Sequence, residues 1–282
     1  MSNLYVVPCA NGFRFQSFGS RRVLSWLLFV LPAFQLNLVS EAAVVGGWDL
    51  SRGGPYSLSA GSNTAPLRTQ LSGLFPGTTI TGTSVLTPAY LSTVDTLVIS
   101  AAFSDSQPIT PLSTPEQTAL TNFVLSGHRA LILGERTGFS PLVNPTLINP
   151  FGLDINGDLV GHLPATVSNP ATSPITSTPF GQVTSLATIN PGWFDQLGAA
   201  HTIATLDING QPLLAMLDAG SLGPGSGAVV LSADSDIYTQ NITLIDNTFA
   251  FLIATPEPSS LILAAFGFAG LAAWSWRRRN RA

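Results

Sequence analysis

The chain has 282 residues, of which 9% are charged, and its formal net charge is −4. Four arginines and thirteen acidic residues lie between positions 44 and 254, which gives this stretch a net charge of −9. This charge argues against a nucleic-acid partner, because binding to phosphates requires a basic surface.

The N-terminal segment, residues 1–42, has the layout of a signal peptide with a long leader. The basic pair Arg21-Arg22 precedes the apolar run VLSWLLFVLPAF, and Ser40 and Ala42 are small residues that fit a cleavage site after Ala42. Because the run is short for a membrane span, we predict a removed signal that delivers the chain to the export translocon. An uncleaved N-terminal anchor is the alternative, and SRRVLS also partly resembles a twin-arginine signal.

Cysteine chemistry depends on the same segment, because Cys9 is the single cysteine of the chain. If the segment is removed, the mature protein has no thiol. It then has no disulfide, no thiolate nucleophile and no cysteine-ligated metal.

The first half of the region 43–254 alternates predicted strands with predicted helices. Strands are expected at 44–49, 78–82, 93–103 and 130–135, and helices at 65–75 and 114–127. The second helix has Thr114 as its expected N-cap, Pro115 at N1 and Gln117 at N3, and Gly127 ends it. Strand, helix and strand with tight connections predict a right-handed parallel crossover. We therefore expect an α/β fold in three layers with a mostly parallel sheet.

The second half is predicted to be richer in β structure. Asn209-Gly210 lies between two apolar runs within 202–217 and favours a β-hairpin, because both residues accept a positive φ. The other expected elements are a surface loop at 163–182, a buried strand at 225–234 and a closing helix at 242–254 with Leu244, Ile245, Phe249 and Leu252 inward.

Polar residues follow two of the predicted strands. Glu135 and Arg136 come at the C-terminal end of a predicted parallel strand, where open α/β sheets bind ligands, and Asp234, Ser235 and Asp236 follow another strand. Together they suggest a small polar site for a cation or a sugar. An arginine–carboxylate pair with ordinary loop-capping groups explains the same residues, and the pattern alone favours it.

Metal ligands are sparse in the sequence. Asp154, Asn156 and Asp158 offer oxygens at positions 1, 3 and 5 of a calcium-type loop, but Leu159 and Ala165 at positions 6 and 12 exclude an EF-hand. An Asn-Gly turn explains the same residues, so we predict no metal or cofactor and keep an improvised calcium site as the minor alternative. The histidines, His128, His162 and His201, have no metal-ligand spacing.

The C-terminal segment, residues 255–282, combines three features. Pro256-Glu257-Pro258 comes first, and an apolar run follows that predicts a transmembrane helix over 259–276. The run from Leu261 to Trp276 spans about 24 Å as a helix, slightly short of a hydrocarbon core of about 30 Å. The basic end consists of Arg277, Arg278, Arg279 and Arg281. By the positive-inside rule these arginines stay cytoplasmic, and the preceding region lies outside.

This combination of triplet, apolar run and basic end resembles the PEP-CTERM sorting signal of Gram-negative bacteria. The resemblance implies recognition by an exosortase-type membrane peptidase that cleaves near the triplet. The chain would then be anchored transiently in the inner membrane and released to the cell surface or the extracellular matrix. A permanent membrane anchor without sorting is the alternative.

The order of elements in 43–254 resembles the class I glutamine amidotransferase-like fold in its exported, often non-catalytic branches. The stretches that carry the likeness are VDTLVIS, TPEQTALTNFVLSGHRALILGE, ITSTPFGQV, GAVVLSADSDIY and IDNTFAFL. The resemblance implies a flavodoxin-like sheet and, in an active enzyme, a cysteine on the turn after a central strand. Here that turn reads Glu135-Arg136-Thr137-Gly138, and no G-x-S-x-G motif replaces the cysteine. We therefore expect a binding or structural role, with an exported hydrolase using carboxylates near Glu135 and Asp234 as the alternative.

Overall fold

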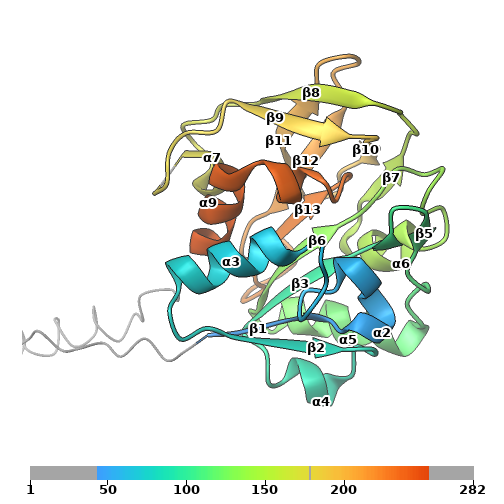
Figure 1. Ribbon diagram of the computed structural model, residues 1–282, viewed down its shortest axis with the longest axis vertical. Helices are drawn as coiled ribbons and strands as arrows, with labels where there is room; N and C mark the ends of the chain where they lie inside the picture. Colours follow the sequence, from blue (N-terminus) through green and yellow to red (C-terminus); the bar gives the residue numbers. More distant parts are fainter. Residues whose placement is uncertain (1–42, 178, 254–282) are drawn as a thin grey trace, which may run out of the picture. The chain divides into compact units, whose positions relative to one another are not determined.

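The computed structural model describes residues 43–177 and 179–253, which form a mixed α/β fold around a nine-stranded sheet (Figure 1). The strand order is β2-β1-β3-β6-β13-β12-β11-β8-β9. The strands are β1 (Val44–Trp48), β2 (Thr79–Thr83), β3 (Thr96–Ser100), β6 (Arg129–Leu133), β8 (His162–Val167), β9 (Ser185–Ile189), β11 (His201–Leu206), β12 (Pro212–Leu217) and β13 (Val229–Ser232). Two smaller sheets pair β4 (Ala102–Ser104) with β5 (Gln107–Pro108) and β7 (Asp154–Asn156) with β10 (Trp193–Gln196).

One half of the large sheet is parallel. Its five strands run β2-β1-β3-β6-β13, which is the strand order of flavodoxin-like doubly wound sheets. β3 pairs with β6 from Thr96 opposite Arg129 to Ser100 opposite Leu133. Every residue of β3 is buried, as expected of a parallel strand that helices cover on both faces. The predicted parallel crossover between these two strands is confirmed.

The other half is antiparallel, so the sheet is mixed and the expectation of a mostly parallel sheet is wrong. β12, β11, β8 and β9 each run antiparallel to the strand before them in the sheet. For β11 and β12 the connection explains this, because a parallel return needs a crossover of about a dozen residues and only a short loop joins these two strands. The β11–β12 hairpin is confirmed, with a longer loop than a two-residue turn. Gly210 alone of the Asn209-Gly210 pair has a positive φ, at 69°.

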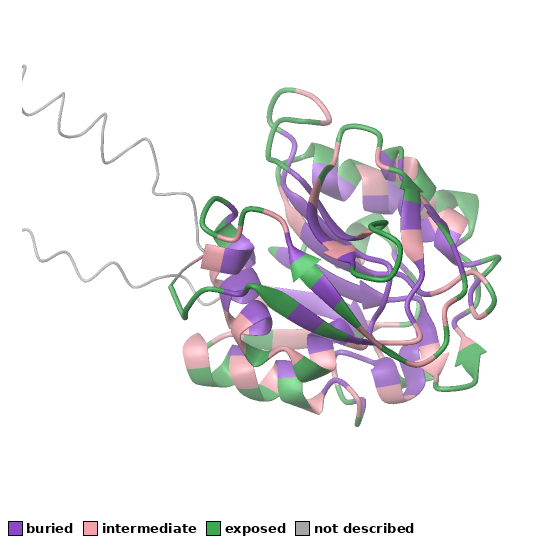
Figure 2. Ribbon diagram, turned by 90° about the horizontal axis from the view of Figure 1, so that it is seen from above, coloured by how far each residue is buried: buried purple, intermediate pink, exposed green. Residues whose placement is uncertain are grey.

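Helices cover both faces of the parallel half. The longer helices are α3 (Ala65–Leu74), α5 (Thr114–Leu125) and α9 (Ile242–Ile253), and the short ones are α2 (Leu50–Gly53), α4 (Pro88–Leu91), α6 (Asn144–Ile148), α7 (Pro174–Ser177) and α8 (Ile237–Gln240), with 3-10 turns η2 (Gly54–Tyr56) and η3 (Asn149–Phe151). α3 packs with α9, and α4 packs with α5. Figure 2 shows buried residues concentrated along the central strands and exposed residues on the outer sides of the helices. The inward face predicted for the closing helix is confirmed.

The N-cap predicted for α5 is wrong by one residue. Ser113 is the N-cap, and it forms a capping box with Glu116. The Glu116 carboxylate accepts hydrogen bonds from the Ser113 N–H at 2.9 Å and from its hydroxyl at 2.8 Å. The charged Glu116 carboxylate is a stronger acceptor for the free N–H at the helix start than the neutral Gln117 amide would be one position later. The helix therefore begins after Ser113. Gly127 ends the helix with φ of 101°, as predicted.

The surface loop predicted over 163–182 is wrong in two parts, because this stretch holds most of β8 and all of α7. Ala165, Val167 and Ile175 are buried. β8 pairs with β11 on one side and β9 on the other, and α7 packs against α9. A composition rich in proline, serine and threonine predicts a loop, but pairing with the neighbouring strands makes 162–167 a strand. The sequence of one strand does not reveal such pairing.

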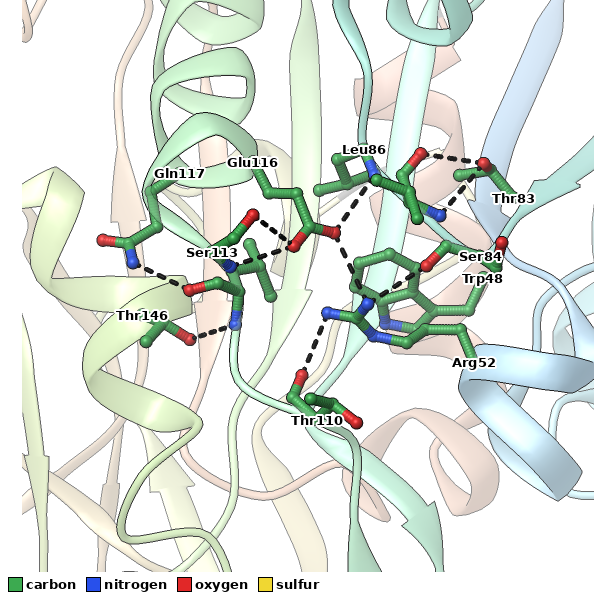
Figure 3. A network of polar contacts seen from close by, with 12 residues as sticks. Trp48, Arg52, Thr83, Ser84, Leu86, Thr110, Ser113, Glu116, Gln117 and Thr146 are labelled. Carbon is green, nitrogen blue, oxygen red and sulfur yellow. Dashed lines mark hydrogen bonds and ion pairs between the residues drawn. The ribbon is translucent and has the colours of Figure 1, made fainter.

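A buried ion pair joins α2 to α5 (Figure 3). The Arg52 guanidinium lies 4.9 Å from the centroid of the Trp48 ring and 3.4 Å from the Glu116 carboxylate. It also donates hydrogen bonds to the carbonyls of Ser84 at 3.1 Å and Thr110 at 2.9 Å. Three loops at the carboxyl ends of the parallel strands are therefore tied to one side chain.

The predicted signal peptide and the transmembrane helix over 259–276 lie outside the described residues. Within 43–177 and 179–253, none of the helices has the length and apolar character that a membrane crossing requires.

Candidate functional site

A cleft of about 510 Å³ opens at the carboxyl ends of the parallel strands. This edge is the position where open α/β sheets bind ligands. The residues that line the cleft are Tyr56, Ser62, Asn63, Pro66, Ala102, Ser104, Asp105, Glu135, Arg136, Phe139, Ile189, Asn190, Asp236 and Thr239. Of the residues predicted to form the polar site, Glu135, Arg136 and Asp236 are among them.

Glu135 reaches the cleft from the end of β6 and is held rigidly there. Its backbone N–H donates to Asn144 Oδ1 at 3.1 Å, and Asn144 Nδ2 donates back to its carbonyl. The Ser235 hydroxyl and N–H both donate to Glu135 Oε1. Only 8% of Glu135 is exposed. Burial raises the pKa of its carboxyl to about 7, and the nearby charge of Asp236 acts in the same direction.

Asp234 lies behind the cleft and does not line it. Its side chain is fully buried, and its two oxygens accept hydrogen bonds from the N–H groups of Ile189 at 3.0 Å and Asp236 at 2.8 Å. Burial raises the pKa of the Asp234 carboxyl, and the charges of Glu135 and Asp236 add to this effect. Asp234 therefore positions two cleft segments and has no open path to a ligand.

Asp236 faces a second carboxylate across the cleft through a shared tyrosine. The Tyr56 hydroxyl donates to Asp105 Oδ1 at 3.0 Å and to Asp236 Oδ1 at 3.5 Å. Asn63 Nδ2 also donates to Asp105 Oδ1, at 3.2 Å. Burial, followed by the charge of Asp105, raises the pKa of Asp236. Burial is also the main cause of the raised pKa of Tyr56, so the phenol stays protonated and keeps donating.

Sequence reasoning missed Tyr56, Asn63 and Asp105. One signal was available, since Tyr56 follows β1 and Asp105 follows β3 and β4, and the ends of parallel strands meet at one edge.

Arg136 pairs with Asp158 at 2.6 Å. Asp158 is the third of the three oxygen ligands considered for calcium, and this ion pair engages its carboxylate. Asn156, the second, accepts from the Gly157 N–H through Oδ1 and donates to Asp195 through Nδ2. Among the residues that the structure describes, no group of three or more His, Cys, Asp or Glu side chains is arranged to hold a metal ion.

The histidines lie in separate places. His128 stacks on Phe123, with ring centroids 4.5 Å apart. His201 lies 3.4 Å from the Asp218 carboxylate at an exposed position. His162 begins β8 and is close enough to Asp236 to lower the pKa of that carboxyl slightly against the effect of burial.

The cleft offers hydrogen-bond acceptors, and its described lining also includes the hydroxyls of Ser62, Ser104 and Thr239. Asp105 and Asp236 supply carboxylates, and Glu135 changes its protonation near neutral pH. Ser235 is only 1% exposed, and its hydroxyl donates a hydrogen bond to Glu135. Such a surface suits a ligand that carries many hydroxyl or ammonium donors.

Comparison with known proteins bears on both parts of the chain. Residues 254–279 match the PEP-CTERM protein-sorting motif. No curated protein matches the chain. Among solved structures, the mmIFT52 N-terminal domain aligns over 76% of this chain and 98% of its own at 16% identity, with a TM-score of 0.55.

Two further structures align at similar coverage of this chain. A beta-galactosidase from Bacillus circulans sp. alkalophilus aligns over 75% of this chain and 30% of its own at 13% identity, with a TM-score of 0.51. A glutamine amidotransferase aligns over 76% and 100% at 15% identity, with a TM-score of 0.46. At these identities the likeness concerns the fold alone. The parallel strand order β2-β1-β3-β6-β13 is the flavodoxin-like order that the amidotransferase-like resemblance implied.

The predicted sorting signal at the C-terminus is thus confirmed as a PEP-CTERM motif. The motif implies export of the chain and processing by an exosortase, which is a membrane peptidase.

Proposed function

We propose that the chain is an exported protein of a Gram-negative bacterium, sorted through its C-terminal signal to the cell surface or the extracellular matrix. It would pass the translocon with a signal cleaved after Ala42 and be anchored in the inner membrane by the segment 259–276 until the exosortase acts. The match of residues 254–279 to the sorting motif supports this route. Replacing Pro256 and Glu257 by alanine should then keep the protein in the membrane fraction, and unchanged release would contradict the route.

For the α/β domain we propose a non-catalytic binding role, with a sugar or a similar polyhydroxylated molecule as the ligand. The cleft at the carboxyl edge of the sheet carries this proposal. Asp105 and Asp236 present carboxylate oxygens that accept from ligand hydroxyls, and Asn63 adds a donor and an acceptor. The rings of Tyr56 and Phe139 offer apolar walls for the C–H faces of a sugar ring.

The test is calorimetric titration of the purified protein with a panel of mono- and oligosaccharides. Asp105→Asn and Asp236→Asn remove one carboxylate each and keep the side-chain size. Because a hydrogen bond to a charged group contributes about 1.5–3 kcal/mol, each variant should bind about 10–150-fold more weakly. Asp207→Asn is the matched control, since Asp207 is exposed in the β11–β12 loop away from the cleft. Equal binding by all three variants would refute a role for the cleft.

An exported hydrolase is the second candidate, and the raised pKa of Glu135 favours it. A carboxyl with a pKa of about 7 is partly protonated at neutral pH, as a general acid must be. The burial of Asp234 weighs against the pair expected from the sequence. Glu135→Gln should abolish hydrolysis of a panel of aryl glycosides and esters without lowering thermal stability, and unchanged activity would remove this candidate.

A further inference from the structure

Both ends of the described chain lie at the same edge of the large sheet. We call this the amino edge, formed by the first residues of the parallel strands. The chain enters there, because Val44 is the first residue of β1 and its N–H donates to Asp95, just before β3, at 2.7 Å.

The chain also leaves at the amino edge. The carbonyl of Leu252, near the end of α9, accepts from the Thr96 hydroxyl at 3.0 Å, and the carbonyl of Phe251 accepts from the Arg129 guanidinium. Thr96 and Arg129 are the first residues of β3 and β6. The cleft lies at the opposite, carboxyl edge. Thus the junctions with both terminal segments are on the side away from the cleft.

The tether between the domain and the predicted membrane segment is short. Residues 254–258 separate Ile253 from the segment that begins at 259, and six Cα–Cα steps reach at most about 20 Å. β12 alone spans about 20 Å between the two edges, and loops extend beyond both of its ends. The tether is therefore too short to pass along the sheet and bring the carboxyl edge to the membrane.

Charge favours the same orientation independently. Acidic side chains gather at the carboxyl edge, including Asp105, Asp158, Asp207 and Asp236, whereas the amino edge has Asp95 and Asp218 together with Arg129. A membrane with anionic headgroups repels these carboxylates within about 8 Å of its surface, the screening length at physiological salt.

We propose that the anchored protein holds its amino edge against the membrane and opens its cleft into the exported space, so that the cleft can be occupied before release. The orientation rests on the anchoring step of the proposed function and does not depend on what the cleft binds. Its consequence is that sorting and ligand binding use opposite edges of the domain.

The two ends of β12 provide matched label positions for a test. Ala219 is exposed in the turn after β12 at the amino edge, and Ile208 is 62% exposed in the β11–β12 loop at the carboxyl edge. Ala219→Cys and Ile208→Cys are made in the full chain with Cys9→Ser, so that each protein has one thiol. A fluorescent donor is attached to this thiol, and the chain is reconstituted into vesicles of phosphatidylethanolamine and phosphatidylglycerol that carry a headgroup acceptor.

We expect energy transfer to the lipid acceptor to cause a clearly larger loss of donor fluorescence at position 219 than at 208. The donor fluorescence of each labelled chain in detergent, without the acceptor lipid, is the reference from which the loss is measured. Equal losses, or a larger loss at 208, would overturn the orientation. Flotation of the vesicles separates the two hypotheses, because a chain that does not float refutes the anchoring step and the orientation with it, whereas a floating chain with equal losses refutes the orientation alone.

Discussion

Glu135→Gln tests whether the buried carboxyl of the cleft titrates near neutral pH. The pKa of Glu135 rises from 4.5 to about 7 in the folded protein, chiefly through burial. A folded-state pKa above the unfolded value means that the folded protein binds the proton more tightly. The stability contributed by this group is therefore fully present below about pH 4.5 and is lost as the pH rises through 7.

The size of the effect follows from the shift. About 2.5 pKa units correspond to about 3 kcal/mol between low pH and pH 8. The glutamine variant has no charge to lose, so its free energy of unfolding relative to the wild type should rise by up to about 3 kcal/mol between pH 4.5 and 8. The substitution also removes the Glu135 charge that raises the pKa of Asp234, so the difference reports Glu135 together with its coupling to Asp234.

The assay is urea denaturation of both proteins at intervals from pH 4 to pH 8. The midpoints and slopes give the free energy of unfolding at each pH. A difference between variant and wild type that stays constant over this range would refute the assignment of a raised pKa to Glu135. A difference that falls with rising pH would show that the carboxyl is stabilised as an anion instead.

Two further predictions concern stability and are measured by the same denaturation assay. Glu116→Ala leaves the partly buried Arg52 without its carboxylate, removes the capping-box acceptor of Ser113 and should cost about 3 kcal/mol. Thr118→Ala on the exposed side of the same helix should cost little, and a loss below about 1 kcal/mol for Glu116→Ala would contradict the importance of this carboxylate. Gly210→Ala should cost about 1 kcal/mol through its φ of 69°, and Gly73→Ala within α3 should stabilise by about 0.5 kcal/mol. An added Cβ meets nothing within 4 Å at either glycine, so equal responses would show that backbone conformation is not the cause.

The parallel half of the sheet was predictable because its signals are local. Contiguous apolar residues of β3 indicate a strand that is buried on both faces, and the glycine after α5 marks the end of that helix. The alternation of these elements then leaves few possible topologies. Local signals of this kind do not depend on the rest of the fold.

The antiparallel half and most of the cleft were not predictable in the same way. β8 contains Pro164 and lies in a stretch rich in turn-forming residues, and only its pairing with β9 and β11 makes it a strand. Tyr56 and Asp105 meet Asp236 through the convergence of distant loops. The burial of Asp234 likewise depends on two backbone donors that other segments of the chain supply.

The C-terminal segment was predictable in identity because its three features are contiguous in the sequence. Pro256, Glu257 and Pro258, the apolar run and the arginines form one motif, and residues 254–279 match it. Its structural part, the transmembrane helix over 259–276, falls outside the described residues and stays a prediction.

The most direct test of the sorting route is the intact mass of the protein recovered from its native host, separated into membrane and released fractions. We expect the released protein to begin after Ala42 and to lack the residues that follow the Pro256–Pro258 triplet. A mass that retains Arg277 to Ala282, found in the membrane fraction alone, would contradict the route and indicate a permanent anchor.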